Sequence, residues 1–269
     1  HRPFKFLKQP PVSGVMAVEA LVETARLLHP HLRLLGVRQV SYRDLLDVPP
    51  DISRHSRLTC RTVAADAREV VCEVTLASPL LSPTGREVDR WSDNFAGQVI
   101  LGGSPRPLSP LRDFPVAAGE LDTRPILPAE VADYYEQRTA MQGRYRVMEF
   151  LEGTGPGCIR GAMIYKEIPD FAGRAANHYH YSPYLLEGLL HLVSFYVAMR
   201  DEAETRQLIP AGFAELRWSR ACRNGERLML EARQTHNDPQ GLTWNAQALD
   251  ESGSILMQTT GLRLLWFTE

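Results

Sequence analysis

The sequence contains a faint internal repeat, and no other feature limits the possible folds as strongly, because a duplicated chain must build related structure twice. The segment Gly36–Tyr42 has the pattern of Gly212–Trp218: a glycine, apolar residues at matching offsets, and a final aromatic residue. More matching dipeptides follow in the same order: Arg57-Leu58 with Arg227-Leu228, Thr84-Gly85 with Ser252-Gly253, and Ala96-Gly97 with Thr260-Gly261. The offset between the copies shrinks slowly along the chain, as small loop deletions would produce. We therefore expect two copies of one structural unit.

Each copy is predicted to begin with a mostly apolar helix and to continue with four strands. The helices are expected over roughly Val15–Leu28 and Tyr184–Met199. In the second copy the strands are expected over these ranges: Phe213–Trp218, Arg227–Gln234, Leu242–Leu249 and Ile255–Trp266. Turn signals such as Asn224-Gly225 separate them, which favours antiparallel hairpins. Each copy is thus an α+β unit, and we expect the two helices to pack side by side with their sheets continuous across the repeat.

A stretch rich in Pro, Gly and Ser joins the two copies, and we interpret it as a surface linker. The expected organisation is a first unit over residues 1–101, a linker over 102–128 and a second unit over 129–269. The second unit adds a short helix and two strand candidates: Glu130–Arg138, Tyr145–Leu151 and Cys158–Lys166. Because nothing in the first unit corresponds to these two strands, we expect that at least one N-terminal strand of that unit is missing from the sequence.

Composition and charge exclude several classes of protein. Of the 269 residues 44% are hydrophobic, and 30 basic against 32 acidic side chains leave a net charge of −2. A nucleic-acid partner is not expected, because phosphate binding requires an excess of positive charge. The four cysteines form no CxxC pair, so neither a zinc site nor a redox pair is predicted, and the thiols are expected to be inert in a reducing compartment.

Neither a membrane span nor a secretion signal is predicted. The longest apolar stretch, Tyr184–Met199, is interrupted by Glu187 and His191, and it is shorter than the ~20 residues that cross a bilayer. The chain does not open with the regions of a signal peptide. We expect a cytoplasmic protein that binds no membrane and uses no cofactor and no metal.

Four segments carry a resemblance to a known enzyme family. Pro11–Glu19 is similar to the motif Pro-Gly-Val-Met-x-x-Glu, with Ser13 where proline is usual, and Ser182–His191 is similar to His-Pro-x-Leu-Leu-Asp-x-x-x-Gln/His. Gln142–Tyr145 resembles a degraded Gly-Pro-x-Phe segment, and Leu208–Phe213 resembles Leu-Pro-x-Gly-Ile. In this order they resemble the double-hotdog dehydratase domains of polyketide synthases, nearest to the enediyne and polyunsaturated-fatty-acid synthase type. The likeness spans nearly the whole chain and implies a double-hotdog fold, two tandem units that each wrap an antiparallel sheet around a long apolar helix.

The resemblance assigns the catalytic acid to the second helix. Glu187 stands at the family's acid position and His191 at that of its partner. Glu187 lies in a leucine-rich stretch, and burial there favours the protonated carboxyl that a leaving hydroxide needs. His191 follows one turn later, so it can reach the Glu187 carboxyl. The alternatives are a glutamate at a helix edge that reaches solvent, and a core histidine bonded to backbone.

The resemblance places the catalytic base upstream of the first helix, where His1 is the available histidine. His1-Arg2-Pro3 resembles an Asp-His-x-Pro variant of the family motif with a longer loop. At the usual spacing the chain instead has Phe4, with Lys8 in the place of a glycine. The alternative is that His1 is not native and that the site has lost its base.

The start of the first helix is the candidate for binding the thioester carbonyl. Its first N–H groups, at Gly14 and Val15, are predicted to face developing negative charge, and the absence of a side chain at Gly14 would let the substrate approach closely. Glu19 occupies the acid position of single-hotdog dehydratases, but in double-hotdog relatives the acid lies on the second helix, so we interpret Glu19 as structural. His178 and His180 form an HxH pair for which a lining role is favoured over metal binding.

The first functional hypothesis is a dehydratase that removes water from a (3R)-3-hydroxyacyl thioester to give an enoyl thioester. Its partners would be the phosphopantetheine-linked acyl chain of an acyl carrier protein and the other domains of the synthase, with homodimerisation left open. The alternatives are a catalytically silent double-hotdog scaffold or dimerisation module, and another thioester enzyme, such as a hydrolase or isomerase, on the same fold.

Overall fold

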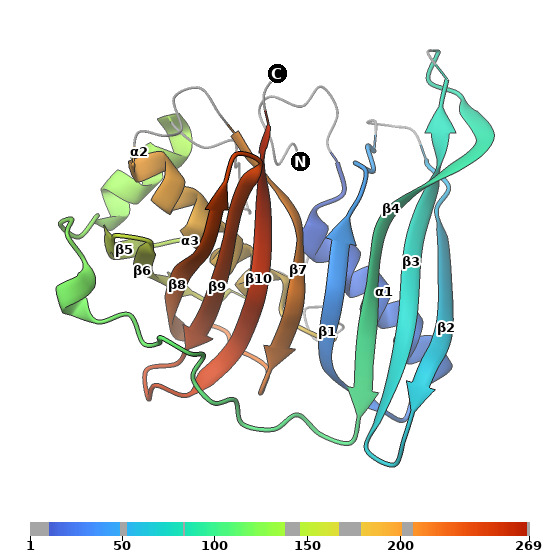
Figure 1. Ribbon diagram of the computed structural model, residues 1–269, viewed down its shortest axis with the longest axis horizontal. Coiled ribbons are helices and arrows are strands. Elements are labelled where there is room, and N and C mark those ends of the chain that lie inside the picture. Colours follow the sequence, from blue (N-terminus) through green and yellow to red (C-terminus); the bar gives the residue numbers. More distant parts are fainter. Residues whose placement is uncertain are drawn as a thin grey trace.

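The computed structural model describes residues 11–48, 53–82, 84–137, 146–166, 179–200 and 207–267. The helices in these ranges are α1 (Gly14–Leu28), α2 (Pro128–Gln137) and α3 (Pro183–Met199), with a 3-10 turn η1 (Ala118–Glu120). The strands in these ranges are β1 (Arg33–Tyr42), β2 (Arg57–Ala65), β3 (Glu69–Leu81), β4 (Glu87–Gly102), β5 (Phe150–Gly155), β6 (Cys158–Ile164), β7 (Gln207–Trp218), β8 (Arg227–Asp238), β9 (Gly241–Leu249) and β10 (Ile255–Phe267). Figure 1 shows their arrangement.

The ten strands form one antiparallel sheet in the order β2-β3-β4-β1-β7-β10-β9-β8-β6-β5. The two units meet where β1 pairs with β7, so the sheet is continuous across the repeat, as predicted. The repeat aligns Gly36 with Gly212 and Ser41 with Arg217. In the sheet, Gly36 pairs with Arg217 and Gly212 pairs with Ser41, so each pair joins the same two repeat positions. This self-consistent register shows that the two units pair as equivalents around an approximate twofold axis. The segments with the clearest sequence repeat are therefore the strands that join the units.

Both long helices lie on the same side of this sheet (Figure 1). α1 contacts β1 to β4, α3 contacts β6, β8 and β9, and the two helices also contact each other. Most residues of α3 are buried, as its apolar sequence requires, because a helix without a polar face is stable only inside a core. The double-hotdog class is confirmed. No helix within the described residues is long and apolar enough to cross a membrane.

The first turn of α3 is capped by the residue that precedes it. The Ser182 side chain accepts a hydrogen bond from the N–H of Leu185 at 3.2 Å, and Pro183 occupies the first helical position. In α1 the corresponding Ser13 caps differently: its side chain makes no cap hydrogen bond, and its carbonyl accepts from the N–H groups of Met16 and Ala17.

One strand begins later than the sequence suggests. The expected strand over Tyr145–Leu151 is β5, which starts at Phe150, and Tyr145 lies outside the described residues. The physical reason is that Met148 does not join the sheet: its N–H donates to the hydroxyl of Tyr135 on α2, at 3.0 Å. Val147 and Met148 are both buried ahead of β5, outside the strand.

The Pro-rich segment between β4 and α2 lies against the second half of the sheet (Figure 1). Gln258 of β10 donates to the carbonyl of Ser109 at 2.6 Å, and Arg233 of β8 forms an ion pair with Glu120 at 2.6 Å. These contacts fix the path of the segment over the sheet, although it has little regular secondary structure.

Candidate active site

Glu187 and His191 lie four residues apart on α3 and face each other, with Nε2 of His191 3.1 Å from Oε1 of Glu187. Only 5% of Glu187 and 1% of His191 is exposed. The alternative of a glutamate at a solvent-facing helix edge therefore does not describe Glu187. The helix geometry that places positions i and i+4 on one face produces this contact, as the spacing predicts.

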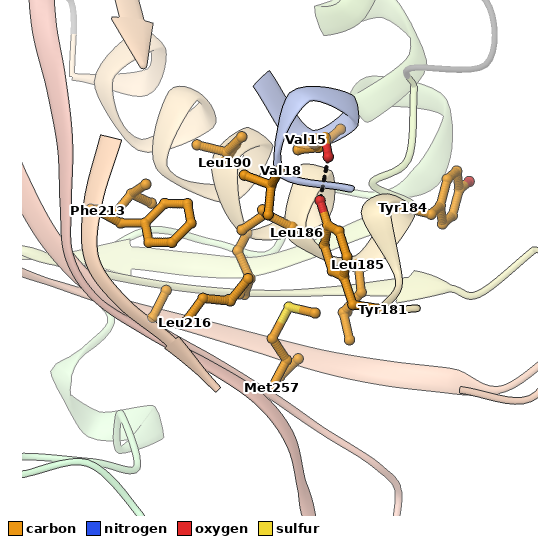
Figure 2. Packing of buried hydrophobic residues seen from close by; sticks show 14 of the residues in the cluster. Val15, Val18, Tyr181, Tyr184, Leu185, Leu186, Leu190, Phe213, Leu216 and Met257 are labelled. Atoms are coloured by element: carbon orange, nitrogen blue, oxygen red, sulfur yellow. Dashed lines mark hydrogen bonds between the residues drawn. The ribbon is translucent and has the colours of Figure 1, made fainter. Parts of the chain in front are cut away.

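Glu187 lies on α3, whose apolar side chains form part of the core between the two helices and the sheet. Figure 2 shows part of this core: leucines of α3 face Val15 and Val18 of α1, with Phe213, Leu216 and Met257 of the sheet on the other side. The Glu187 side chain is therefore largely shielded from solvent.

Three tyrosines lie close enough to Glu187 to respond to its charge: Tyr42 of β1, Tyr135 of α2 and Tyr181 before α3. Burial, and to a smaller extent the charge of Glu187 when ionised, raises the pKa of each hydroxyl above its usual range. All three hydroxyls therefore keep their hydrogen near neutral pH. The sequence analysis missed these residues, because they lie on three separate segments and share no motif.

The second ring nitrogen of His191 is bound by Tyr135. The Tyr135 hydroxyl lies 2.9 Å from Nδ1 of His191, and the two rings are 5.7 Å apart. His191 is thus held by two side chains, Tyr135 and Glu187, and not by backbone as the alternative interpretation had it.

The first turn of α1 faces the segment that leads into α3. Tyr181 donates a hydrogen bond to the carbonyl of Val15 (Figure 2). A Cβ added to Gly14 would lie 2.5 Å from the ring of Tyr42. The missing side chain at Gly14 therefore makes room for Tyr42, and a substrate contact at Gly14 would have to use its N–H. The amides of Gly14 and Val15 precede the first donors within α1, those of Met16 and Ala17.

Glu19 is buried on α1 and accepts a hydrogen bond from the N–H of His180 at 2.7 Å. This contact agrees with the structural role expected for Glu19. Burial lowers the pKa of His180, which disfavours its charged form. His178, the other histidine of the HxH pair, lies outside the described residues, and no group of three metal-ligating side chains occurs in the part of the chain that the structure describes.

His1 also lies outside the described residues. The first described residue, Pro11, forms an isolated antiparallel β-bridge with Asp47. The N–H of the next residue, Val12, donates to the carbonyl of Leu46 at 2.8 Å. The distance from His1 to Glu187 therefore stays a prediction.

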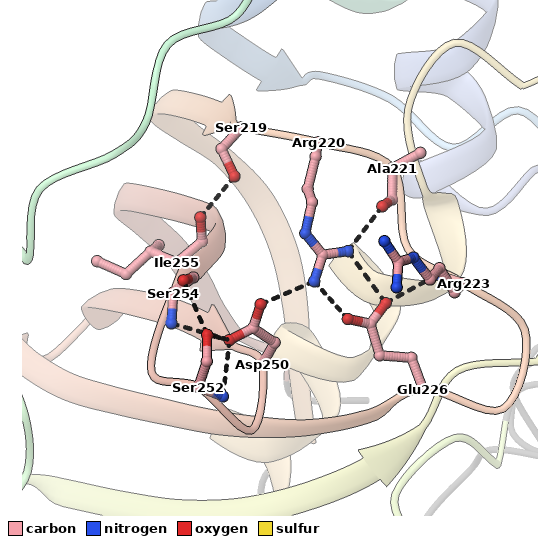
Figure 3. Close-up of polar contacts among 9 residues, drawn as sticks. All are labelled: Ser219, Arg220, Ala221, Arg223, Glu226, Asp250, Ser252, Ser254 and Ile255. Carbon is pink, nitrogen blue, oxygen red and sulfur yellow. Dashed lines mark hydrogen bonds and ion pairs between the residues drawn. The ribbon is translucent and has the colours of Figure 1, made fainter.

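A polar network supports the start of α3 (Figure 3). Arg220 binds Glu226, and its Nη2 atom lies 2.8 Å from Oδ2 of Asp250. The backbone N–H of Tyr165 donates a hydrogen bond to the backbone carbonyl of Glu226 at 2.8 Å. The ring of Tyr165 packs edge-on against Tyr184 in the first turn of α3. The network thus holds the loop around Glu226, and through Tyr165 it contacts the first turn of α3.

The cysteines offer no nucleophile. All four are free thiols. Burial raises the pKa of Cys60 and of Cys222 to about 12 and also raises that of Cys158. A protonated thiol is a poor nucleophile, which agrees with the inert cysteines expected from the sequence.

Comparisons with known proteins show the family and the fold of this chain. The model of the polyketide synthase dehydratase N-terminal domain matches residues 115–269, more than half of the chain. No curated protein sequence matches. Among solved structures, the dehydratase domain from the CurF module of the curacin polyketide synthase is 16% identical, with a TM-score of 0.72 over 96% of this chain and 86% of that one.

Two further solved structures have the same fold. A trans-AT polyketide synthase dehydratase domain from Brevibacillus brevis is 12% identical, with a TM-score of 0.73 over 96% of this chain and 86% of that one. A trans-acyltransferase polyketide synthase enoyl-isomerase is 13% identical, with a TM-score of 0.67 over 97% of this chain and 93% of that one. With the family match over residues 115–269, the chain belongs to the polyketide synthase dehydratase family.

Proposed function

We propose that this dehydratase domain eliminates water from a 3-hydroxyacyl thioester carried on the phosphopantetheine arm of an acyl carrier protein, within a larger synthase. The observation that carries the proposal is the Glu187 carboxyl, which is buried on α3 and bound by His191 at 3.1 Å. A carboxylic acid at this position can deliver its proton to a leaving hydroxyl.

In the proposed reaction, a base removes the proton from the α-carbon, and the electron pair of that C–H bond forms the new double bond. The C–O bond at the β-carbon then breaks as Glu187 donates its proton, so that the hydroxyl leaves as water and Glu187 becomes a carboxylate. The proton on the base returns to Glu187 through solvent after product release. We assign the base to His1, on the resemblance alone, and the amides of Gly14 and Val15 to the thioester oxygen.

Two variants of one relative support the need for both a histidine and a carboxylic acid. Solved variants of the CurK dehydratase are described as inactive when a histidine is replaced by phenylalanine and when an aspartate is replaced by asparagine. In this chain Glu187 is our candidate for the carboxylic acid and His1 for the histidine. That the chain belongs to the enediyne or polyunsaturated-fatty-acid synthase type stays a prediction, and so does its cytoplasmic location.

The proposal is tested by incubating the protein with 3-hydroxybutyryl and longer 3-hydroxyacyl chains on holo acyl carrier protein and recording the mass of the carrier. Loss of one water molecule supports the proposal, and an unchanged mass with every chain length contradicts it. The fold likeness to an enoyl-isomerase favours one second candidate, double-bond migration, which would move the double bond of an enoyl chain without a change in mass.

A further inference from the structure

Tyr135, on α2, ends a buried chain of hydrogen bonds that leads to Glu187. Its hydroxyl oxygen lies 3.0 Å from the amide nitrogen of Met148 and 2.9 Å from Nδ1 of His191, whose Nε2 lies 3.1 Å from Oε1 of Glu187. Tyr135 and His191 are 2% and 1% exposed. Water therefore competes little for these contacts, and their donors and acceptors follow from the chemistry of the groups.

The hydrogen bond between Tyr135 and His191 has a defined direction. The backbone N–H of Met148 donates to the Tyr135 oxygen at 3.0 Å. This amide occupies an acceptor position of the phenol oxygen, and the phenol's own O–H is directed to Nδ1 of His191 at 2.9 Å. Burial raises the pKa of Tyr135 above its usual range, so this hydrogen is retained.

The direction of this bond fixes the state of His191. A ring nitrogen that accepts a hydrogen bond carries no hydrogen, so the ring hydrogen of His191 sits on Nε2 and is donated to Oε1 of Glu187. A doubly protonated imidazole has no acceptor for Tyr135. The chain of contacts thus favours a neutral Glu187–His191 pair over an ion pair.

On the basis of the proposed function, we propose that Tyr135 is a positioning residue that fixes the tautomer of His191 and thereby keeps the acidic proton of Glu187 on Oε2, the oxygen that His191 does not bind. Oε1 accepts from His191 as the carbonyl-like oxygen of the acid. The proton needed by the leaving hydroxyl is then held on one oxygen before the substrate arrives.

The direct test is the tautomer of His191, read from the ¹⁵N chemical shifts and long-range proton couplings of the protein labelled with ¹⁵N-histidine. The His191 signal is assigned by its absence from the His191→Gln variant. In the wild-type protein at neutral pH we expect a neutral ring with its hydrogen on Nε2. A ring with its hydrogen on Nδ1, or a charged ring, overturns the proposal, and this measurement needs no Tyr135 variant to fold.

The second test removes only the hydroxyl, with Tyr135→Phe. The ring contact with Phe195, at 5.0 Å between centroids, does not need the hydroxyl. We expect a mixture of His191 tautomers and a kcat lower by about tenfold with KM within twofold, a part of the 10²–10⁴ that a general acid contributes. The matched control is Tyr134→Phe, the neighbouring tyrosine on α2, whose ring stacks on Phe195 at 4.8 Å and which is expected to change neither quantity.

An unchanged tautomer and an unchanged kcat in Tyr135→Phe overturn the proposal. A wild-type protein that dehydrates no 3-hydroxyacyl carrier refutes the proposed function instead. The tautomer of His191 is measured in the unliganded protein and does not depend on turnover. Failure of the Tyr135 proposal can therefore be distinguished from failure of the proposed function.

Discussion

The backbone N–H of His180 donates to Oε1 of Glu19 at 2.7 Å, between residues that are 161 positions apart in the sequence. The next residue, Tyr181, donates to the carbonyl of Val15. These two bonds attach the segment before α3 to the first turns of α1. The amides at the start of α1 and the carboxyl of Glu187 therefore keep a fixed relation, although each belongs to a different repeat unit.

Glu187 on α3 and Glu19 on α1 are expected to respond differently when the carboxyl is replaced by an amide. Glu187→Gln keeps the shape of the side chain but cannot donate an acidic proton, so we expect dehydration to fall by a factor on the order of 10²–10⁴ with folding retained. The measurement is the rate of water loss from a 3-hydroxyacyl carrier, together with the circular-dichroism melting curve.

Glu19→Gln is the matched control for this variant. Its amide oxygen still accepts the N–H of His180, but the charge is lost, so we expect a stability loss of about 1 kcal/mol and dehydration within threefold of wild type. Wild-type turnover in Glu187→Gln, or a larger loss of turnover in Glu19→Gln, would show that the acid has been assigned to the wrong helix.

His191→Ala should reduce turnover less than Glu187→Gln, because His191 orients the acid and does not donate the proton itself. We expect a decrease of about tenfold, as a fraction of the general-acid contribution. Stability should fall by about 1–3 kcal/mol, because the buried hydroxyl of Tyr135 loses its partner. Urea unfolding and steady-state kinetics measure the two effects. His191→Gln, whose amide can still donate to Glu187, should recover most of the turnover, and a failure to do so would argue against an orienting role.

Gly14→Ala should destabilise the fold, although alanine is normally the better helix former. The added Cβ would lie 2.5 Å from the ring of Tyr42, and relieving this overlap is expected to cost about 1–3 kcal/mol in urea unfolding. Gly103→Ala is the control, because a Cβ there meets nothing within 4 Å. A gain in stability from Gly14→Ala, or a cost that persists when Tyr42 is also replaced by alanine, would contradict the proposed overlap.

Asp250 is expected to contribute to resistance against acid unfolding. The hydroxyl of Ser252 and the guanidinium of Arg220 lower the pKa of Asp250 from 3.8 to about 2 (Figure 3). Because the folded-state pKa lies below the unfolded one, the stabilisation is fully present above about pH 4 and is lost as the pH falls toward 2. The stability difference between wild type and Asp250→Asn should therefore shrink over this range in urea unfolding. A difference that stays constant from pH 5 to pH 2 would show that the titration of Asp250 does not couple to folding.

The sequence by itself determined the repeat, both long helices and most strands. The helices α1 and α3 follow from runs of apolar residues, and β8 to β10 follow from alternation between turn signals. The contact between Glu187 and His191 was also predictable, because a helix brings positions i and i+4 together whatever surrounds it. These are features in which neighbours along the chain decide the structure.

Only the tertiary structure decided what surrounds that pair. Tyr42, Tyr135 and Tyr181 come from β1, from α2 and from the segment before α3, and their approach to Glu187 depends on the pairing of β1 with β7 and on the packing of the helices. The late start of β5 has the same origin, because the N–H of Met148 binds Tyr135 from another element. Local periodicity carries no information about such contacts, since the partners of a buried polar group are chosen by the packing of elements distant in sequence.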